Sequence, residues 1–166
     1  MIFSTSTDKF VRKKTGGAFL LFFSPLLLMF ISYGKIFPWI LFAIFLFLLF
    51  FTFLSKPTKY EVSDQQFIIH RYKGNVVINI EDIARVDRIH HDLLINSVKG
   101  GAFGYFGDFH TDLGKIRYYA TRRDKVVLLS KKDNTKIAVT PDDQDGLIEL
   151  LDKKISNHYR LGLLAS

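Results

Sequence analysis

The stretch VVLLSKKDNTKIAVTPDDQDGLIELLDKKI, residues 126–155, decides the fold of this chain. It begins with two apolar segments, 126–130 and 135–140, in which Val and Ile favour extended backbone. The four residues between them, 131–134, are charged or turn-forming, so the two segments predict a β-hairpin. The second segment runs directly into a pattern with helical spacing. The stretch therefore predicts a hairpin that is followed by a C-terminal helix.

The expected helix has signals at both of its ends. Thr140 is a candidate N-cap, and Pro141 suits the first helical position. Carboxylates follow where the helix dipole is positive, and lysines lie near the far end, where it is negative. One face is apolar and must cover a core, and it consists of Leu147, Ile148, Leu151 and Ile155. We expect this face to cover the open end of a two-sheet β structure.

Upstream of the hairpin, short segments alternate with the period of two that is typical of strands. Turn residues at 73–75 join two of these segments into a second hairpin. Together with the strands of residues 126–140, the pattern predicts about seven antiparallel strands in two sheets. The upstream strands are expected at 58–63, 66–72, 76–78, 83–89 and 115–121.

A long segment separates the fourth and fifth expected strands, from His90 to Gly114. A connection of this length in a compact domain is usually functional. Its glycines permit positive φ angles, and aromatic residues stand between them. We expect these aromatics either to pack into the core or to face a membrane or a partner. They are Phe103, Tyr105, Phe106 and Phe109.

The N-terminal third has a different composition. Two long apolar runs, 16–33 and 36–54, contain no charged residue and are separated only by Gly34 and Lys35. As helices they would be about 27 to 29 Å long, close to the roughly 30 Å of a bilayer's hydrocarbon core. The pattern predicts a transmembrane helical hairpin. A cleaved signal peptide is the alternative for the first run, but no A-x-A-like site follows it and a second run comes at once.

Basic residues at the flanks indicate the orientation of this hairpin. Six lie at its outer ends and only Lys35 lies at its tip, and positive flanks stay in the cytoplasm. We therefore expect both termini in the cytoplasm and residues 33–35 on the other side. The six outer residues are Lys9, Arg12, Lys13, Lys14, Lys56 and Lys59.

Seven strands followed by one amphipathic helix is the element order of a pleckstrin-homology (PH) domain. Residues 58–155 resemble the membrane-attached bacterial PH domain family more specifically. Three pieces carry the resemblance: GAFGYFG at 101–107, GKIRYYAT at 114–121 and TPDD at 140–143. The resemblance implies a PH-like β domain attached to two transmembrane helices of the bacterial inner membrane, and it brings no catalytic site.

Basic residues near strand turns of a PH-like fold can hold anionic headgroups, and cations close to an anionic leaflet contribute about 1 kcal/mol each. The alternative is a solvated turn whose charge is balanced by Asp124. The candidates are Arg71 and Lys73 near one turn, and Arg122, Arg123 and Lys125 near another.

The composition excludes several classes of chemistry. The chain has no cysteine, which excludes disulfides and Cys-ligated zinc. His90, His91 and His110 invite a metal hypothesis, but neighbouring residues of a strand point to opposite faces, so we predict no metal site. No G-x-S-x-G motif or phosphate-binding loop is present. Only +3 of the net charge of +7 lies in residues 55–166, which gives nucleic-acid binding little support. We expect neither an enzyme nor a cofactor.

These features divide the chain into a basic N-terminal segment, a transmembrane hairpin, a PH-like domain and a C-terminal tail. Their expected bounds are 1–15, 16–54, 55–156 and 157–166. We predict a non-catalytic, membrane-anchored PH-like binding or scaffolding module at the cytoplasmic face. Its expected partners are the lipid bilayer and either anionic lipid headgroups or another membrane protein. The alternative is a structural subunit that forms a homo-oligomer through a sheet edge or the aromatic segment.

Overall fold

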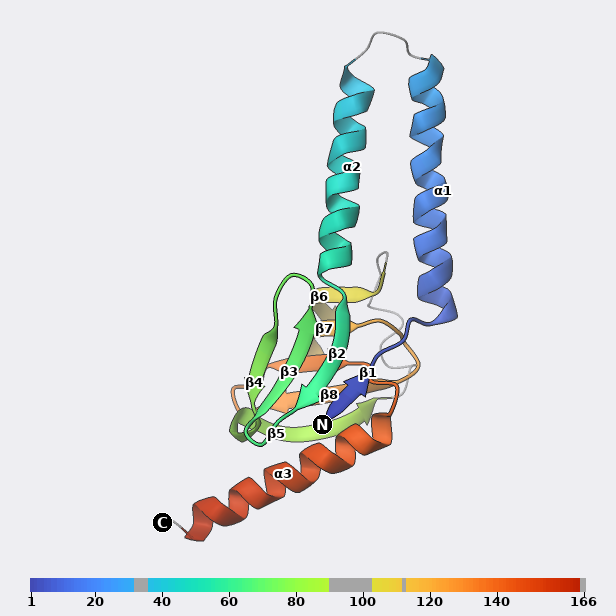
Figure 1. The fold of residues 1–166 in the computed structure, drawn as a ribbon. Coiled ribbons are helices and arrows are strands. Elements are labelled where there is room, and N and C mark those ends of the chain that lie inside the picture. Colours follow the sequence, from blue (N-terminus) through green and yellow to red (C-terminus); the bar gives the residue numbers. More distant parts are fainter. Residues whose placement is uncertain (32–35, 90–102, 112, 165–166) are drawn as a thin grey trace.

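The computed structural model describes the backbone of residues 1–31, 36–89, 103–111 and 113–164, and their side chains except those of 21–31, Pro38 and 159–164. Two helices, α1 (Lys9–Ile31) and α2 (Phe37–Leu54), run side by side and project from a β domain (Figure 1). A third helix, α3 (Gln144–Leu164), crosses the opposite end of that domain.

The first sheet has four antiparallel strands in the order β1-β2-β3-β4. Its first strand comes from the N-terminus, ahead of the two helices, and its other three strands follow the helices in the chain. The strands are β1 (Ile2–Ser4), β2 (Pro57–Val62), β3 (Gln66–Arg71) and β4 (Val76–Asn79).

The second sheet has five strands in the order β5-β8-β9-β7-β6. Its pairs are antiparallel except that of β7 and β9, which run parallel. A short 3-10 helix, η1 (Ile80–Asp82), connects the two sheets. The strands are β5 (Ile83–Ile89), β6 (Tyr105–Thr111), β7 (Gly114–Ala120), β8 (Val126–Lys131) and β9 (Lys136–Val139).

The two sheets and the C-terminal helix agree with the sequence prediction, and each of the seven predicted strands has a counterpart. The structure adds β1 and β6, and it makes one pair parallel, so the expectation of about seven antiparallel strands needs correction. Strand β1 has three residues, too few to show a period of two. Strand β6 contains Gly107, whose φ of 107° breaks the regular pattern, and it falls in the segment that was expected to be a long connection.

The N-terminal residues complete the β domain. Phe3 pairs with Tyr60 of β2 and is only 4% exposed, within the apolar core. The terminal ammonium of Met1 donates a hydrogen bond to the carbonyl oxygen of Val62 at 2.6 Å. Residues from both sides of the helix pair therefore form one sheet, and the helices α1 and α2 are an insertion between its first two strands.

The base of α1 also belongs to the domain. Asp8 caps the helix, because its Oδ1 accepts a hydrogen bond from the backbone N–H of Val11 at 2.6 Å. The Val11 side chain is 1% exposed and joins an apolar cluster of the second sheet. One turn further, the Thr15 hydroxyl accepts a hydrogen bond from the N–H of Phe103 at 2.9 Å. The helix thus starts seven residues before the apolar run that predicted it.

Among the residues with described side chains, no helix is both long and apolar enough to cross a membrane. This finding contradicts the predicted transmembrane hairpin and the predicted two-pass location in the bacterial inner membrane. The described side chains of α1 end at Leu20, and its first turns carry four basic residues. In α2 the described side chains are continuous only from Trp39 to Leu54. A span needs roughly 20 consecutive apolar residues. The predicted tip, residues 33–35, lies outside the described residues.

Apolar clusters lie on both faces of the second sheet. In β8, Val127 and Leu129 belong to the cluster that is shared with the first sheet and α3, whereas Val126 and Leu128 belong to the cluster on the other face. The predicted apolar face of α3 is confirmed in this core, where three of its residues are buried: Leu147, Leu151 and Ile155.

The start of α3 differs from the prediction. Asp143 caps the helix, since its Oδ1 accepts a hydrogen bond from the N–H of Gly146 at 3.0 Å. Thr140, the predicted cap, is instead fully buried ahead of the helix. Its N–H donates to the hydroxyl of Tyr60, and its own hydroxyl accepts from the N–H of Thr121. These bonds hold Thr140 within the β domain, and Asp143 caps α3 in its place.

Candidate functional site

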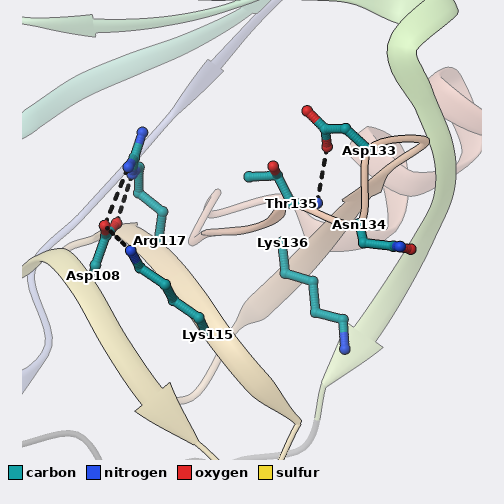
Figure 2. Close-up of a pocket in the computed structure, with 7 residues that line it drawn as sticks. All are labelled: Asp108, Lys115, Arg117, Asp133, Asn134, Thr135 and Lys136. Carbon is teal, nitrogen blue, oxygen red and sulfur yellow. Dashed lines mark hydrogen bonds and ion pairs between the residues drawn. The ribbon is translucent and has the colours of Figure 1, made fainter.

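A polar hollow of about 240 Å³ opens at the edge of the second sheet. Figure 2 shows that its walls come from two separate hairpins, β6–β7 on one side and the β8–β9 turn on the other. Its lining is charged or polar throughout and consists of Asp108, Lys115, Arg117, Asp133, Asn134, Thr135 and Lys136.

The β6–β7 wall is built around one carboxylate. Asp108 and Arg117 are directly opposite each other in the register of the two strands. Arg117 donates two hydrogen bonds to that carboxylate, Nε to Oδ1 at 2.6 Å and Nη2 to Oδ2 at 3.1 Å. The Lys115 Nζ lies 2.9 Å from the same Oδ2. The wall therefore holds a carboxylate between a planar guanidinium fork and an ammonium, the usual geometry for recognising this group.

These two cations hold the pKa of the Asp108 carboxyl well below its usual range, with the hydrogen bond from Arg117 as the largest cause and that from Lys115 as the second. The Arg117 guanidinium has a raised pKa for the reciprocal reason. A lowered carboxyl pKa contributes stability that is present above the unfolded value, about 3.9, and is lost as the pH falls through the folded-state pKa. The arrangement is therefore fully charged at neutral pH.

The opposite wall has its own satisfied carboxylate. Asp133 accepts hydrogen bonds from Lys131 Nζ at 2.9 Å and from the N–H of Thr135 at 2.8 Å, and these contacts lower its pKa to about 2. Lys136 crosses toward β7, where its Nζ donates to the carbonyl oxygen of Leu113 at 2.6 Å. An ammonium has three N–H donors, so Lys115 and Lys136 have donors beyond the bonds named. The hollow can accept an anionic group.

The predicted basic residues Arg122, Arg123 and Lys125 have internal partners in the structure. Arg122 is 16% exposed at its side chain, and its guanidinium contacts the carboxylates of Asp124 and Asp142. Arg123 lies over the ring of Phe10, 3.4 Å from its centroid. The Lys125 Nζ donates to the carbonyl oxygen of Asp142 at 2.6 Å. This group holds the N-terminal segment against the domain.

The second predicted group, Arg71 and Lys73, lies at the end of β3 and the turn after it. Lys73 Nζ lies 4.0 Å from the ring centroid of Phe51, and its N–H donates to the last carbonyl of α2. The Arg71 guanidinium lies over the ring of Tyr119, 5.1 Å from its centroid. None of the five predicted cations is among the described residues that line the hollow.

The four predicted aromatic residues occupy three different environments. Phe103 lies between the helices, with edge-to-face contacts to Phe19 of α1 and Phe53 of α2 at centroid distances of 6.3 and 5.5 Å. Tyr105 is 3% exposed in the cluster on the outer face of the second sheet. Phe109 is half-buried against the same cluster, where it packs edge-to-face on Tyr118. Phe106 is half-buried and pairs with Tyr119. The structure does not bring the four together on one surface.

Among the described residues, no group of His, Asp and Glu side chains has the arrangement of a metal site. His110 is exposed on β6, and His90 and His91 lie outside the described residues. A second polar hollow, of about 210 Å³, includes Lys154, which pairs with Asp64 at 2.9 Å, and His158, whose Nε2 lies 3.6 Å from Glu81. Its charged groups are thus paired with one another.

The sequence analysis did not single out Asp108, Lys115, Arg117 and Lys136. A signal was present, since the pairing of Thr111 with Gly114 places Asp108 opposite Arg117 and His110 opposite Lys115. Because the surrounding segment is rich in glycine, the sequence indicated a loop there, and strand β6 was not predicted. Lys136 joins the group only through the parallel pairing of β7 and β9, which no local pattern indicates.

Comparison with known protein families supports the assignment of the β domain. A family described as Bacterial PH domain has a model that matches residues 58–155, and this confirms the resemblance found in the sequence. The match begins after β1 and both N-terminal helices. Neither the curated proteins nor the solved structures contain a match to the chain.

Proposed function

Because this chain belongs to the bacterial PH domain family, we propose that it is a non-catalytic binding module whose β domain holds an anionic group of its partner in the hollow between β6–β7 and the β8–β9 turn. One observation carries the proposal. Three cationic side chains from two hairpins line the hollow, Lys115 and Arg117 at Asp108 and Lys136 at the carbonyl oxygen of Leu113, and both of its carboxylates already have partners.

The chemistry of the lining favours an anion with several oxygens. Lysine offers a point charge, and the guanidinium fork of arginine matches a carboxylate or a phosphate. Hydrogen bonds to charged groups contribute about 1.5–3 kcal/mol when water is excluded. The side chains of Lys115 and Arg117 are 59% and 49% exposed, so screening reduces each contribution to about 1 kcal/mol or less. The site suits a module that binds reversibly.

The first test removes the two cations of the β6–β7 wall from the full-length chain, in a non-ionic detergent. The double variant K115A/R117A is expected to bind labelled hexaglutamate and inorganic tripolyphosphate about tenfold more weakly than the unsubstituted chain, because two partly exposed charge contacts of this size are lost. Fluorescence anisotropy measures the hexaglutamate affinity, and competition measures that of tripolyphosphate.

The matched control is R85A/K153A, which also removes one arginine and one lysine, but from β5 and α3. It should retain the affinity of the unsubstituted chain for both probes. If the two double variants lose affinity equally, the effect comes from net charge alone and the proposed site is excluded. If the unsubstituted chain binds neither probe, the proposed function fails.

One observation favours a second candidate, a structural subunit that self-associates. The described side chains of α2 are apolar except for Thr52 and largely exposed, with Trp39 at 60%, Phe47 at 66% and Phe50 at 61%. An exposed apolar surface of this extent marks an interaction surface. Amine cross-linking of the full-length chain in cells should then give a ladder of multiples, which F47S/F50S removes. A single monomer band would reject this candidate.

A further inference from the structure

Within the described part of the chain, no strand lies on the outer edge of β6. Strand β6 ends the second sheet, and among the described residues it pairs only with β7, over all seven of its residues. The other sheet ends differ, because β1 and β4 have three and four residues and β5 packs against α3. An edge strand with unpaired N–H and C=O groups can accept an extended peptide.

The alternation of an antiparallel pair shows which groups of β6 point outward. Thr111 and Gly114 are register partners only three positions apart, which makes them a hydrogen-bonded pair, so every second residue from Thr111 bonds to β7. The backbone groups of Phe106, Asp108 and His110 therefore face the free edge. Asp108 and His110 are also exposed residues.

The same alternation places the charged wall next to this edge. The side chains of Asp108 and His110 lie on the same side of the sheet as those of Arg117 and Lys115, their register partners. A strand added to β6 would lie about 4.8 Å from it, and every second side chain of that strand would fall on this side. An acidic side chain there would lie beside Asp108 and compete with it for the two cations.

We infer that the occupant of the hollow is an extended acidic segment of a partner protein, and that this segment pairs with the outer edge of β6. This inference rests on the proposed function of the hollow. One carboxylate of this segment replaces Asp108 on Arg117 and Lys115. Asp108 shows that the fork and the ammonium accept a planar carboxylate in this position, and the free edge supplies the backbone hydrogen bonds. Asp108 is thus an internal competitor that keeps the cations paired when the segment is absent.

The experiment uses the full-length chain in non-ionic detergent with hexaglutamate and tripolyphosphate as probes. Removing the competing charge with Asp108→Asn should tighten hexaglutamate binding about fivefold. His110→Pro removes an outward N–H without removing a bond to β7 and should weaken hexaglutamate binding about tenfold or more, while His110→Ala leaves it unchanged. Neither change at His110 should alter tripolyphosphate binding.

Equal affinities of H110P and H110A for hexaglutamate would overturn strand pairing. Hydrogen exchange on the unsubstituted chain is a second test of strand pairing, and it does not depend on the folding of H110P. Hexaglutamate should protect the backbone amides of Phe106, Asp108 and His110 from exchange. Unprotected amides at saturating peptide would also overturn the inference. After either of these negative results, the proposed function would still be supported if K115A/R117A lost tripolyphosphate binding. If the unsubstituted chain bound neither probe, the proposed function would also be rejected.

Discussion

Replacing Phe3 with alanine is expected to lower the free energy of unfolding of the β domain by about 3–5 kcal/mol, the usual cost of truncating a buried phenylalanine. Phe3 lies 54 positions before the first residue of β2, yet it is 4% exposed in the core that both sheets and α3 share. The loss combines the removal of apolar contacts with the cavity that remains. Chemical denaturation of the full-length chain, followed by far-ultraviolet circular dichroism, measures it.

The matched control for Phe3 is its neighbour Ile2, which is in the same strand but 60% exposed. Ile2→Ala should change the free energy of unfolding by about 0.5 kcal/mol or less, as is usual for exposed positions. If the two substitutions had the same effect, β1 would not be part of the folded domain. The result also bears on where the domain begins, because the family match starts only at residue 58.

Replacing Gly104 with alanine should destabilise the fold by at least about 2 kcal/mol. Its φ is 149°, where side chains are strained, and strain of this kind costs about 1–3 kcal/mol. A Cβ atom would also lie 2.5 Å from the carbonyl oxygen of Ala120, a backbone atom of β7 that cannot rotate away. Glycine at this position allows the chain to enter β6 against the end of β7. Chemical denaturation measures this effect as well.

Gly16 provides a control of opposite sign. It lies within α1, and a Cβ atom there would have no neighbour within 4 Å. Gly16→Ala should therefore leave the fold intact and favour the helix by up to about 1 kcal/mol. Unchanged stability in G104A would mean that the close approach of residue 104 to β7 is absent in solution.

Local patterns in the sequence predicted the parts of the fold that depend on local chemistry. The period of two placed seven strands, and the spacing of Leu147, Leu151 and Ile155 identified the buried face of α3. Strand β1 could not be found in this way, because its pairing with β2 spans both helices. The apolar composition of residues 16–54 predicted a transmembrane hairpin, whereas the described helices fall short of a span and α1 begins within the domain at Lys9.

The site was harder to predict than the fold for a related reason. The cations of the β7–β8 turn, such as Arg122, were candidates for holding an anionic headgroup, with a turn balanced by Asp124 as the alternative. In the structure Arg122 pairs with Asp124, and Ser6 and Asp142 also reach it from distant parts of the chain. Arg117 and Lys136 come together through register and parallel pairing, which tertiary structure determines. Charge in a sequence indicates the residue types of a binding site, and only long-range pairing shows which of them are already occupied.

The central claim is that an anionic group of a partner enters the hollow and meets Arg117. The most direct measurement is the Nε–H resonance of Arg117 in nitrogen-15 spectra of the full-length chain during a titration with hexaglutamate. This N–H donates to Asp108 at 2.6 Å in the free protein, and Arg85 Nε, which donates to Asp87 at the same distance, provides an internal reference. The account predicts a saturable shift of the Arg117 signal with no shift of the Arg85 signal. A stationary Arg117 signal, or equal shifts of both, would contradict it.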